Sequence, residues 1–132
     1  MIINSSNANI INTKAVDLHD YMFRSIEYDF IDSVVKIKYG LGKEIIFYSV
    51  LGISTVACRF WGETDPAILD FVYVPESDRI ILPKLLKERE DGIQQYGKHA
   101  EGRMKTDTTY IEVLLVLSTG DRITIVCESI EI

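Results

Sequence analysis

The 132-residue chain has few of the residues from which reactive or cross-linked centres are built, with two cysteines and two histidines. Cys58 and Cys127 each lie in an apolar stretch, where a free thiol behaves as a small hydrophobe. We therefore expect both to be reduced and buried, since no signal points to an oxidising compartment. Without Cys-x-x-Cys spacing, these residues do not make a usual zinc ligand set. The sequence predicts no metal site and no cofactor.

Positive charge is also scarce, because 14 basic residues face 20 acidic ones and the formal net charge is −6. Such a charge repels phosphate backbones and anionic lipid, so we expect no nucleic-acid partner. The N-terminal stretch MIINSSNANIINTK lacks the apolar run of a secretion signal. The longest apolar stretch, residues 45–61, is interrupted by Ser, Gly and Thr. We expect no membrane partner and a cytoplasmic location.

Motifs for catalysis are missing too. There is no Gly-x-Ser-x-Gly elbow, and the Gly-Leu-Gly of residues 40–42 lacks the strand, helix and lysine of a phosphate loop. The adjacent pair His19 and Asp20 resembles a metal-ligand pair, but neighbouring residues on a strand point to opposite faces. We expect Asp20 instead to satisfy a backbone turn where the first strand starts. The sequence predicts no catalytic residue, and we favour a non-enzymatic protein while leaving an enzyme open.

What the sequence does contain is alternating hydrophobicity. Residues 22–30 alternate with Arg24 as the polar exception, 34–39 alternate cleanly, and Asp29 to Ser33 is read as the turn between them. Gly52 is expected to mark either a bulge in the next apolar run or a break into two strands, Glu44 to Val50 and Ser54 to Trp61. Further strands are predicted at 67–74, at 110–117 and at 122–128, the last two as a central hairpin around Ser-Thr-Gly-Asp.

The predicted fold is therefore mainly β, α+β at most: six or seven antiparallel strands in a twisted sheet, sandwich or partly open barrel, with at most one short helix. The length suits a single domain spanning 1–132. We expect an irregular N-terminal segment at 1–16 and an exposed insertion at 83–109. A short strand is predicted over Arg79 to Leu82, then a helical turn that Gly92 stops.

A candidate binding site lies in CRFWGETDPAILDF, residues 58–71. Trp61 and Arg59 share a strand face that leads into the acidic turn of Glu63 and Asp65, and Trp and Arg are enriched at interface hot spots. The alternative is that Trp61 caps the core and Arg59 pairs with a carboxylate of a neighbouring strand, such as Asp70 or Glu128. The candidate binding residues form one set: Arg59, Trp61, Glu63, Asp65 and Asp20.

The LHD before the first strand, the CRFWG corner with its ILDF strand, and the closing YIEVLLVLSTGDRITIVCESIEI hairpin resemble small uncharacterised bacterial single-domain proteins. The likeness spans most of the chain. Some similar sequences belong with immunity-type proteins of bacterial toxin systems. The resemblance implies a binding role and assigns no functional residue.

Two functions are compatible with the sequence. The first is a non-enzymatic protein-binding module, immunity-like in its specific form, whose acidic surface and Trp61 region engage a basic protein. The second is a small-molecule binder or hydrolase whose pocket is lined by Tyr28, Tyr39, Tyr48 and Tyr73. A concave cavity favours the second and a flat acidic face the first. Oligomeric state is not specified by either pattern.

Overall fold

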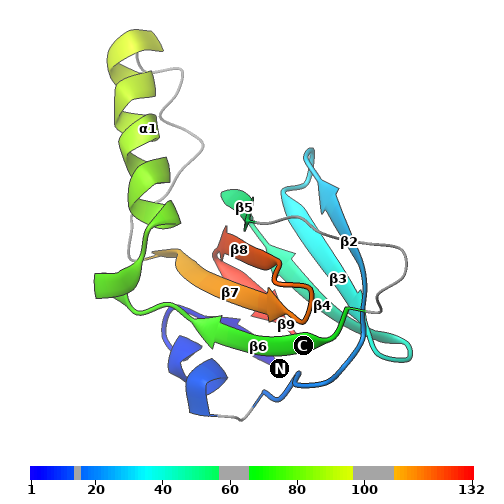
Figure 1. Ribbon diagram of the computed structural model, residues 1–132. Coiled ribbons are helices and arrows are strands. Elements are labelled where there is room, and N and C mark those ends of the chain that lie inside the picture. The colour runs from blue at the N-terminus through cyan, green and yellow to red at the C-terminus, as the bar shows by residue number, and fades with distance from the viewer. Residues whose placement is uncertain (14–15, 57–65, 97–108) are drawn as a thin grey trace.

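The computed structural model describes residues 1–13, 16–56, 66–96 and 109–132. Its described strands are β1 (Ile2–Asn4), β2 (Phe23–Asp29), β3 (Val34–Tyr39), β4 (Lys43–Tyr48), β5 (Gly52–Val56), β6 (Ile68–Tyr73), β7 (Ile111–Leu117), β8 (Arg122–Cys127) and β9 (Ser129–Glu131). They form a five-stranded sheet in the order β1-β9-β4-β3-β2 and a four-stranded sheet in the order β5-β8-β7-β6 (Figure 1). All pairings are antiparallel. The prediction of a mainly β fold is confirmed, with nine described strands where six or seven were expected.

One core lies between the two sheets, because each contributes alternate side chains to a single buried cluster. On β3 the buried residues are Val35, Ile37 and Tyr39, while Lys36 and Lys38 face solvent. The β7–β8 hairpin occupies the two central positions of its sheet, as predicted from apolar residues on both of its faces. Its buried alternate residues are Ile111, Val113, Leu115, Leu117, Ile123, Ile125 and Cys127.

The chain passes from one sheet to the other between Tyr48 and Gly52, and of the bulge or break expected at Gly52 the structure has the break. Ser49 takes a left-handed φ of 51° there, and β5 then starts in the four-stranded sheet. The returning chain crosses at Glu128, between β8 and β9. The two crossings lie side by side, since Leu51 N–H donates to Val126 C=O at 2.8 Å and Glu128 N–H donates to Tyr48 C=O at 3.2 Å. Two antiparallel segments thus run together through both sheets.

Bulges alter the predicted alternation in two strands. The β2–β3 register shifts between Phe23 and Ser25, so Arg24, the polar exception in the sequence, is the extra residue. Phe23 is therefore buried in place of Met22, which is exposed. A similar shift at Leu69 on β6 buries Ile68 and Phe71 together. Plain alternation over the strand predicted at 67–74 would put Leu69 and Phe71 on one face, and this is wrong because a bulge changes the parity of the residues that follow it.

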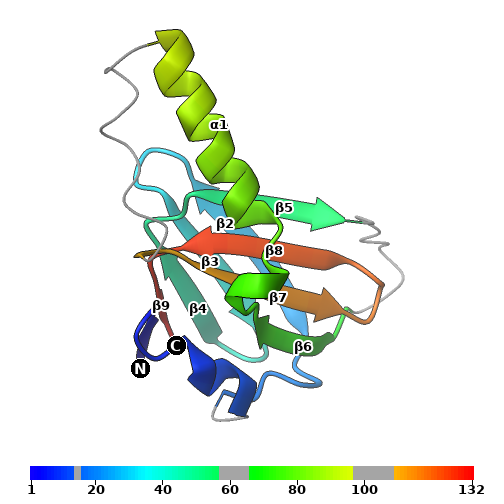
Figure 2. The ribbon, with the colours of Figure 1, turned by 90° about the vertical axis from the view of Figure 1, so that its left-hand side faces the viewer.

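The predicted strand over Arg79 to Leu82 was also wrong. A short 3-10 turn, η2 (Glu76–Asp78), leads into one helix, α1 (Ile81–Tyr96), which runs past Gly92. The start of α1 packs on the four-stranded sheet, because Leu82 joins Tyr110 and Val126 in a second buried cluster. The far end of the helix projects beyond the sheets (Figure 2). The expected insertion at 83–109 is thus anchored at its start, and residues 97–108 lie outside the described residues.

The N-terminal segment is more regular than expected. β1 pairs with β9, and the 3-10 helix η1 (Ala8–Thr13) buries Ala8 and Ile11 in the main core. The prediction of an irregular segment at 1–16 failed because these interactions are with residues far along the chain. No described helix is long and apolar enough to cross a bilayer.

Candidate functional site

Four of the predicted binding residues, Arg59, Trp61, Glu63 and Asp65, lie outside the described residues. Cys58 also falls there. The fifth, Asp20, lies in the described part of the chain, beside Ile68 at the start of β6. Ile68 follows Asp65 by three residues in the sequence. The functional role of the Trp61 stretch stays a prediction.

Asp20 sits in a tight turn with a left-handed φ of 69°. Its N–H donates to Ile68 C=O at 2.9 Å, and its carboxylate Oδ1 lies 3.6 Å from Nε2 of His19, with 80% of the side chain exposed. The side chain that satisfies this turn is instead that of Asp17, whose Oδ1 accepts the His19 N–H at 3.0 Å. The predicted turn exists, but its stabilising carboxylate belongs to Asp17, because an Asx turn bonds the N–H two residues further on.

The outer edge of β6 is held at two points by side chains. At one end, Nδ1 of His19 lies 3.1 Å from Leu69 C=O. At the other end, the amide of Asn12 on η1 binds both main-chain groups of Tyr73, donating to the C=O and accepting from the N–H at 2.9 Å each. The Asn12 amide thus replaces the peptide group of a neighbouring strand at this edge.

Between these two contacts, the main chain of Phe71 faces outward. Tyr73 turns its N–H and C=O away from β7, and in an antiparallel ladder the residue two positions earlier does the same. In the part of the chain that the structure describes, we find no hydrogen-bond partner for these two groups of Phe71. The edge of β6 is therefore open for the length of one residue.

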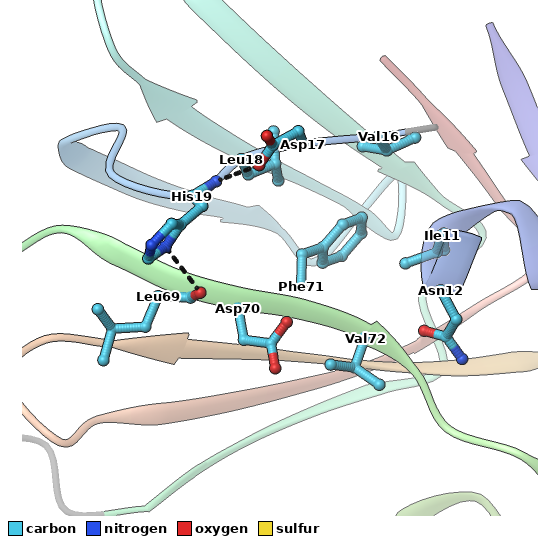
Figure 3. A pocket seen from close by; sticks show the side chains of 10 residues that line it. All are labelled: Ile11, Asn12, Val16, Asp17, Leu18, His19, Leu69, Asp70, Phe71 and Val72. Atoms are coloured by element: carbon cyan, nitrogen blue, oxygen red, sulfur yellow. Dashed lines mark hydrogen bonds between the residues drawn. The ribbon is translucent and has the colours of Figure 1, made fainter. Parts of the chain in front are cut away.

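A pocket of about 450 Å³ lies at this opening (Figure 3). β6 forms one side and residues 16–18 the opposite side, while His19 and η1 close its two ends. Its lining is Ile11, Asn12, Val16, Asp17, Leu18, His19, Leu69, Asp70, Phe71 and Val72. The floor is apolar, because Ile11, Val16, Leu18 and Phe71 are all core residues. The polar rim carries two carboxylates, Asp17 and Asp70.

The lining limits what chemistry the pocket supports. It holds no Ser, Thr, Cys, Tyr or Lys that would serve as a nucleophile. Over the described residues, no group of three metal-ligating side chains converges on a point. The pocket offers hydrogen-bond acceptors above an apolar floor, an arrangement suited to binding a cationic group with an apolar stem.

Comparisons of the chain with protein-family models, with curated proteins and with solved structures found no match. The resemblance to small bacterial proteins, immunity-type ones included, therefore stays a prediction.

The four tyrosines of the alternative function do not gather in one described cavity. Tyr28 stacks on Phe30 with ring centroids 4.3 Å apart, and Tyr39 packs edge-on to Tyr21. The hydroxyl of Tyr48 donates a hydrogen bond to the carboxylate of Glu131 at 2.8 Å. Tyr73 receives a hydrogen bond from the Arg79 guanidinium at 2.7 Å. None of the four tyrosines lines the pocket at β6.

Of the two cysteines, Cys127 lies within the described residues and Cys58 lies outside them. Cys127 is a free thiol in the core, and burial raises its pKa well above the ordinary value. The prediction that it is buried is confirmed. The state of Cys58 stays a prediction.

Reasoning from the sequence missed Asn12, Asp17 and the open edge at Phe71. The role of Asp17 could have been predicted, because an Asp side chain commonly accepts the N–H of the residue two positions later in an Asx turn. The role of Asn12 could not, because its partner Tyr73 is 61 residues away.

Proposed function

We propose that the chain is a cytoplasmic, non-enzymatic protein-binding module that docks a basic partner at the edge of β6. An immunity-type protein of a bacterial toxin system is the specific class that the sequence resemblance implies. One observation carries the proposal. The pocket at this edge joins an apolar floor to the carboxylates of Asp17 and Asp70, and its lining holds no Ser, Thr, Cys, Tyr or Lys.

Charge supports the same partner. The net charge of −6 attracts cationic proteins at long range and speeds their association. Asp20 adds a third carboxylate near the His19 end of the pocket. Ordinary protein recognition needs such a polar rim around an apolar centre. No reacting group is required for this function.

Selection of short peptides from a random displayed library tests the proposal. We expect the immobilised chain to enrich peptides rich in Arg and Lys. The test variant joins Asp17→Asn and Asp70→Asn, and the new amide of the first substitution retains an oxygen to accept the His19 N–H. The control joins Asp78→Asn and Asp91→Asn, which neutralises two exposed carboxylates outside the pocket.

The selected peptides should bind the test variant at least about tenfold more weakly than the control, the loss expected when one charge-assisted contact is removed. Equal binding of the peptides to both variants would show that they dock outside the pocket at β6. If no peptide is enriched, or the enriched peptides are neutral or acidic, the proposed function fails.

A further inference from the structure

The turn between β2 and β3 carries two large apolar side chains into solvent. Phe30 is 79% exposed and Ile31 is 92% exposed. Turns usually have small or polar residues at these positions, and folding gains little from apolar side chains that stay in water. Adjacent exposed apolar residues of this kind mark interaction sites more often than single ones do. The turn lies at the opposite end of the molecule from η1 (Figure 1 and Figure 2).

Hydrogen bonds hold the main chain of this turn at both of its ends. On the β2 side, Oδ1 of Asp29 accepts the N–H of Ile31 at 2.9 Å and the N–H of Asp32 at 3.0 Å. On the β3 side, Ser33 has a left-handed φ of 56°. Its C=O accepts the N–H of Val50, in the crossing between the sheets, at 2.8 Å. The two apolar side chains are therefore presented on a preformed turn.

The position of the Phe30 ring is also fixed. The ring stacks on that of Tyr28, which packs against the main core. Leu41 at the β3–β4 turn is just as exposed, at 90%, but it is a single apolar residue between Gly40 and Gly42. A group that is already held in place loses less conformational freedom when it binds. The β2–β3 turn is therefore better prepared for docking than the β3–β4 turn.

Acidic groups lie beside the exposed pair. A hollow of about 350 Å³ is lined by Glu27, Asp29, Asp32, Val34, Lys36, Ile46 and Tyr48. It brings together three carboxylates and one ammonium, and that ammonium lies across the strand pair from Glu27. The charge beside the turn is therefore negative. It favours a basic surface, and it disfavours both anionic lipid and a second copy of this acidic chain.

We infer that Phe30 and Ile31 insert into an apolar cleft of a protein whose rim is basic. The turn is convex and its apolar tip has a charged border, so its partner needs a concave apolar centre with the opposite charge around it. This docking surface goes beyond the proposed function. The described residues around its hollow include none that lines the pocket at β6.

Selection of disulfide-closed peptides from a random displayed library tests the inference, because closed peptides can form small clefts. We expect the immobilised chain to enrich a family that combines apolar residues with Arg or Lys. This family should bind the variant Phe30→Ser/Ile31→Ser at least about tenfold more weakly than the parent, the scale of one buried apolar side chain. Leu41→Ser removes an equally exposed apolar residue from another turn and should bind as the parent does.

A milder variant and a mapping experiment separate loss of contact from loss of fold. Ile31→Ser alone changes a side chain that is 92% exposed, so it should keep the parent's ¹⁵N spectrum and still weaken binding. In the ¹⁵N-labelled parent, the peptides should shift the amide signals of residues 29–33. Asp32→Asn should weaken binding as well, whereas Asp78→Asn, an exposed carboxylate outside the hollow, should not.

Three results would overturn the inference. The first is that no enriched peptide depends on Phe30 and Ile31, or that those that do lack basic residues. The second is binding of the parent, but not of Ile31→Ser, to phosphatidylcholine vesicles, since the turn would then insert into a bilayer. The third is self-association of the parent that Ile31→Ser abolishes in sedimentation velocity, which would make a second copy the occupant.

The outcome is separable from that of the proposed function. Peptides that depend on the β2–β3 turn should bind Asp17→Asn/Asp70→Asn as they bind the parent. If every basic peptide depends on Asp17 and Asp70 and none on the turn, the proposed function stands and this inference fails. If the peptides depend on the turn alone, the inference stands and the pocket at β6 loses its role.

Discussion

The carboxylate of Glu112 on β7 accepts the N–H of Leu82, at the start of α1, at 2.7 Å. Glu112 is only 3% exposed and Leu82 only 2%. The second carboxylate oxygen lies 3.3 Å from the N–H of Ile80. A side chain of the sheet therefore caps the helix, whose first N–H groups have no partner within the helix itself. A carboxylate is also favoured at this end of the helix dipole.

Replacement of Glu112 should loosen the helix from the sheet. Glu112→Ala leaves the Leu82 N–H buried and unpaired, so we expect a loss of about 2–3 kcal/mol in the free energy of unfolding. Glu112→Gln keeps one acceptor oxygen and should cost less, about 1 kcal/mol. Urea unfolding gives both values. Glu90→Ala, an exposed position on the same helix, is the control and should stay within about 0.5 kcal/mol of the parent.

Cys127 should react slowly in the native protein. Burial raises the pKa of its thiol well above the ordinary value, and the thiolate is the reactive form. In a Cys58→Ser variant, iodoacetamide should label Cys127 only at the rate of unfolding. Rapid labelling of the folded protein would show that the thiol is accessible.

The same raised pKa predicts a loss of stability in alkaline solution. The folded state keeps the Cys127 proton, whereas the unfolded state releases it above about pH 8.5. The contribution of Cys127 to the free energy of unfolding is therefore fully present below that pH. It falls as the pH rises, by up to about 1.4 kcal/mol per pH unit. Comparing Cys58→Ser with Cys58→Ser/Cys127→Ala by urea unfolding isolates this slope. Identical slopes in the two variants would contradict it.

Removal of the Asn12 amide should expose the β6 edge. Asn12→Ala breaks both hydrogen bonds to Tyr73, and because this edge is solvent-exposed we expect a cost of about 1 kcal/mol. The unpaired edge then becomes a template for another chain. Sedimentation velocity should show concentration-dependent association that Asn9→Ala, an exposed neighbour on η1, does not show. A monomeric Asn12→Ala protein of parental stability would mean that water replaces the amide without consequence.

Two glycines of the β3–β4 turn form a matched pair. Gly40 and Gly42 have φ of 55° and 71°, a region that L-residues occupy at a cost of about 1–2 kcal/mol. A Cβ at Gly40 would also lie 2.9 Å from Cδ1 of Tyr21, whereas one at Gly42 meets nothing within 4 Å. Gly40→Ala should therefore be the more destabilising of the two in thermal unfolding. Equal losses would show that the Tyr21 ring moves aside freely.

The parts of the fold that the sequence predicts are those with local signals. The alternation of Val35, Ile37 and Tyr39 survives because no bulge interrupts β3. Arg24 and Leu69 show the limit, since each bulge arises from pairing with another strand and reverses the predicted face. The cap of α1 by Glu112 was equally hidden, because the two partners lie 30 residues apart.

For the candidate site, the sequence predicted Asp20 as a binding residue, whereas the structure has other carboxylates in the pocket. Asp20 lies next to the pocket, but Asp17 and Asp70 line it. The pocket depends on where η1 meets β6, a contact between segments some 60 residues apart that leaves no local pattern.

The paired crossings at Leu51 and Glu128 also affect how the molecule comes apart. Because β4 with β9 and β5 with β8 are successive parts of one ribbon, the hydrogen bonds of one sheet continue directly into those of the other. Separating the two sheets at these crossings therefore requires breaking the ribbon that they share. Amide protons in the middle of both sheets should therefore exchange with solvent at a common rate, through cooperative global opening.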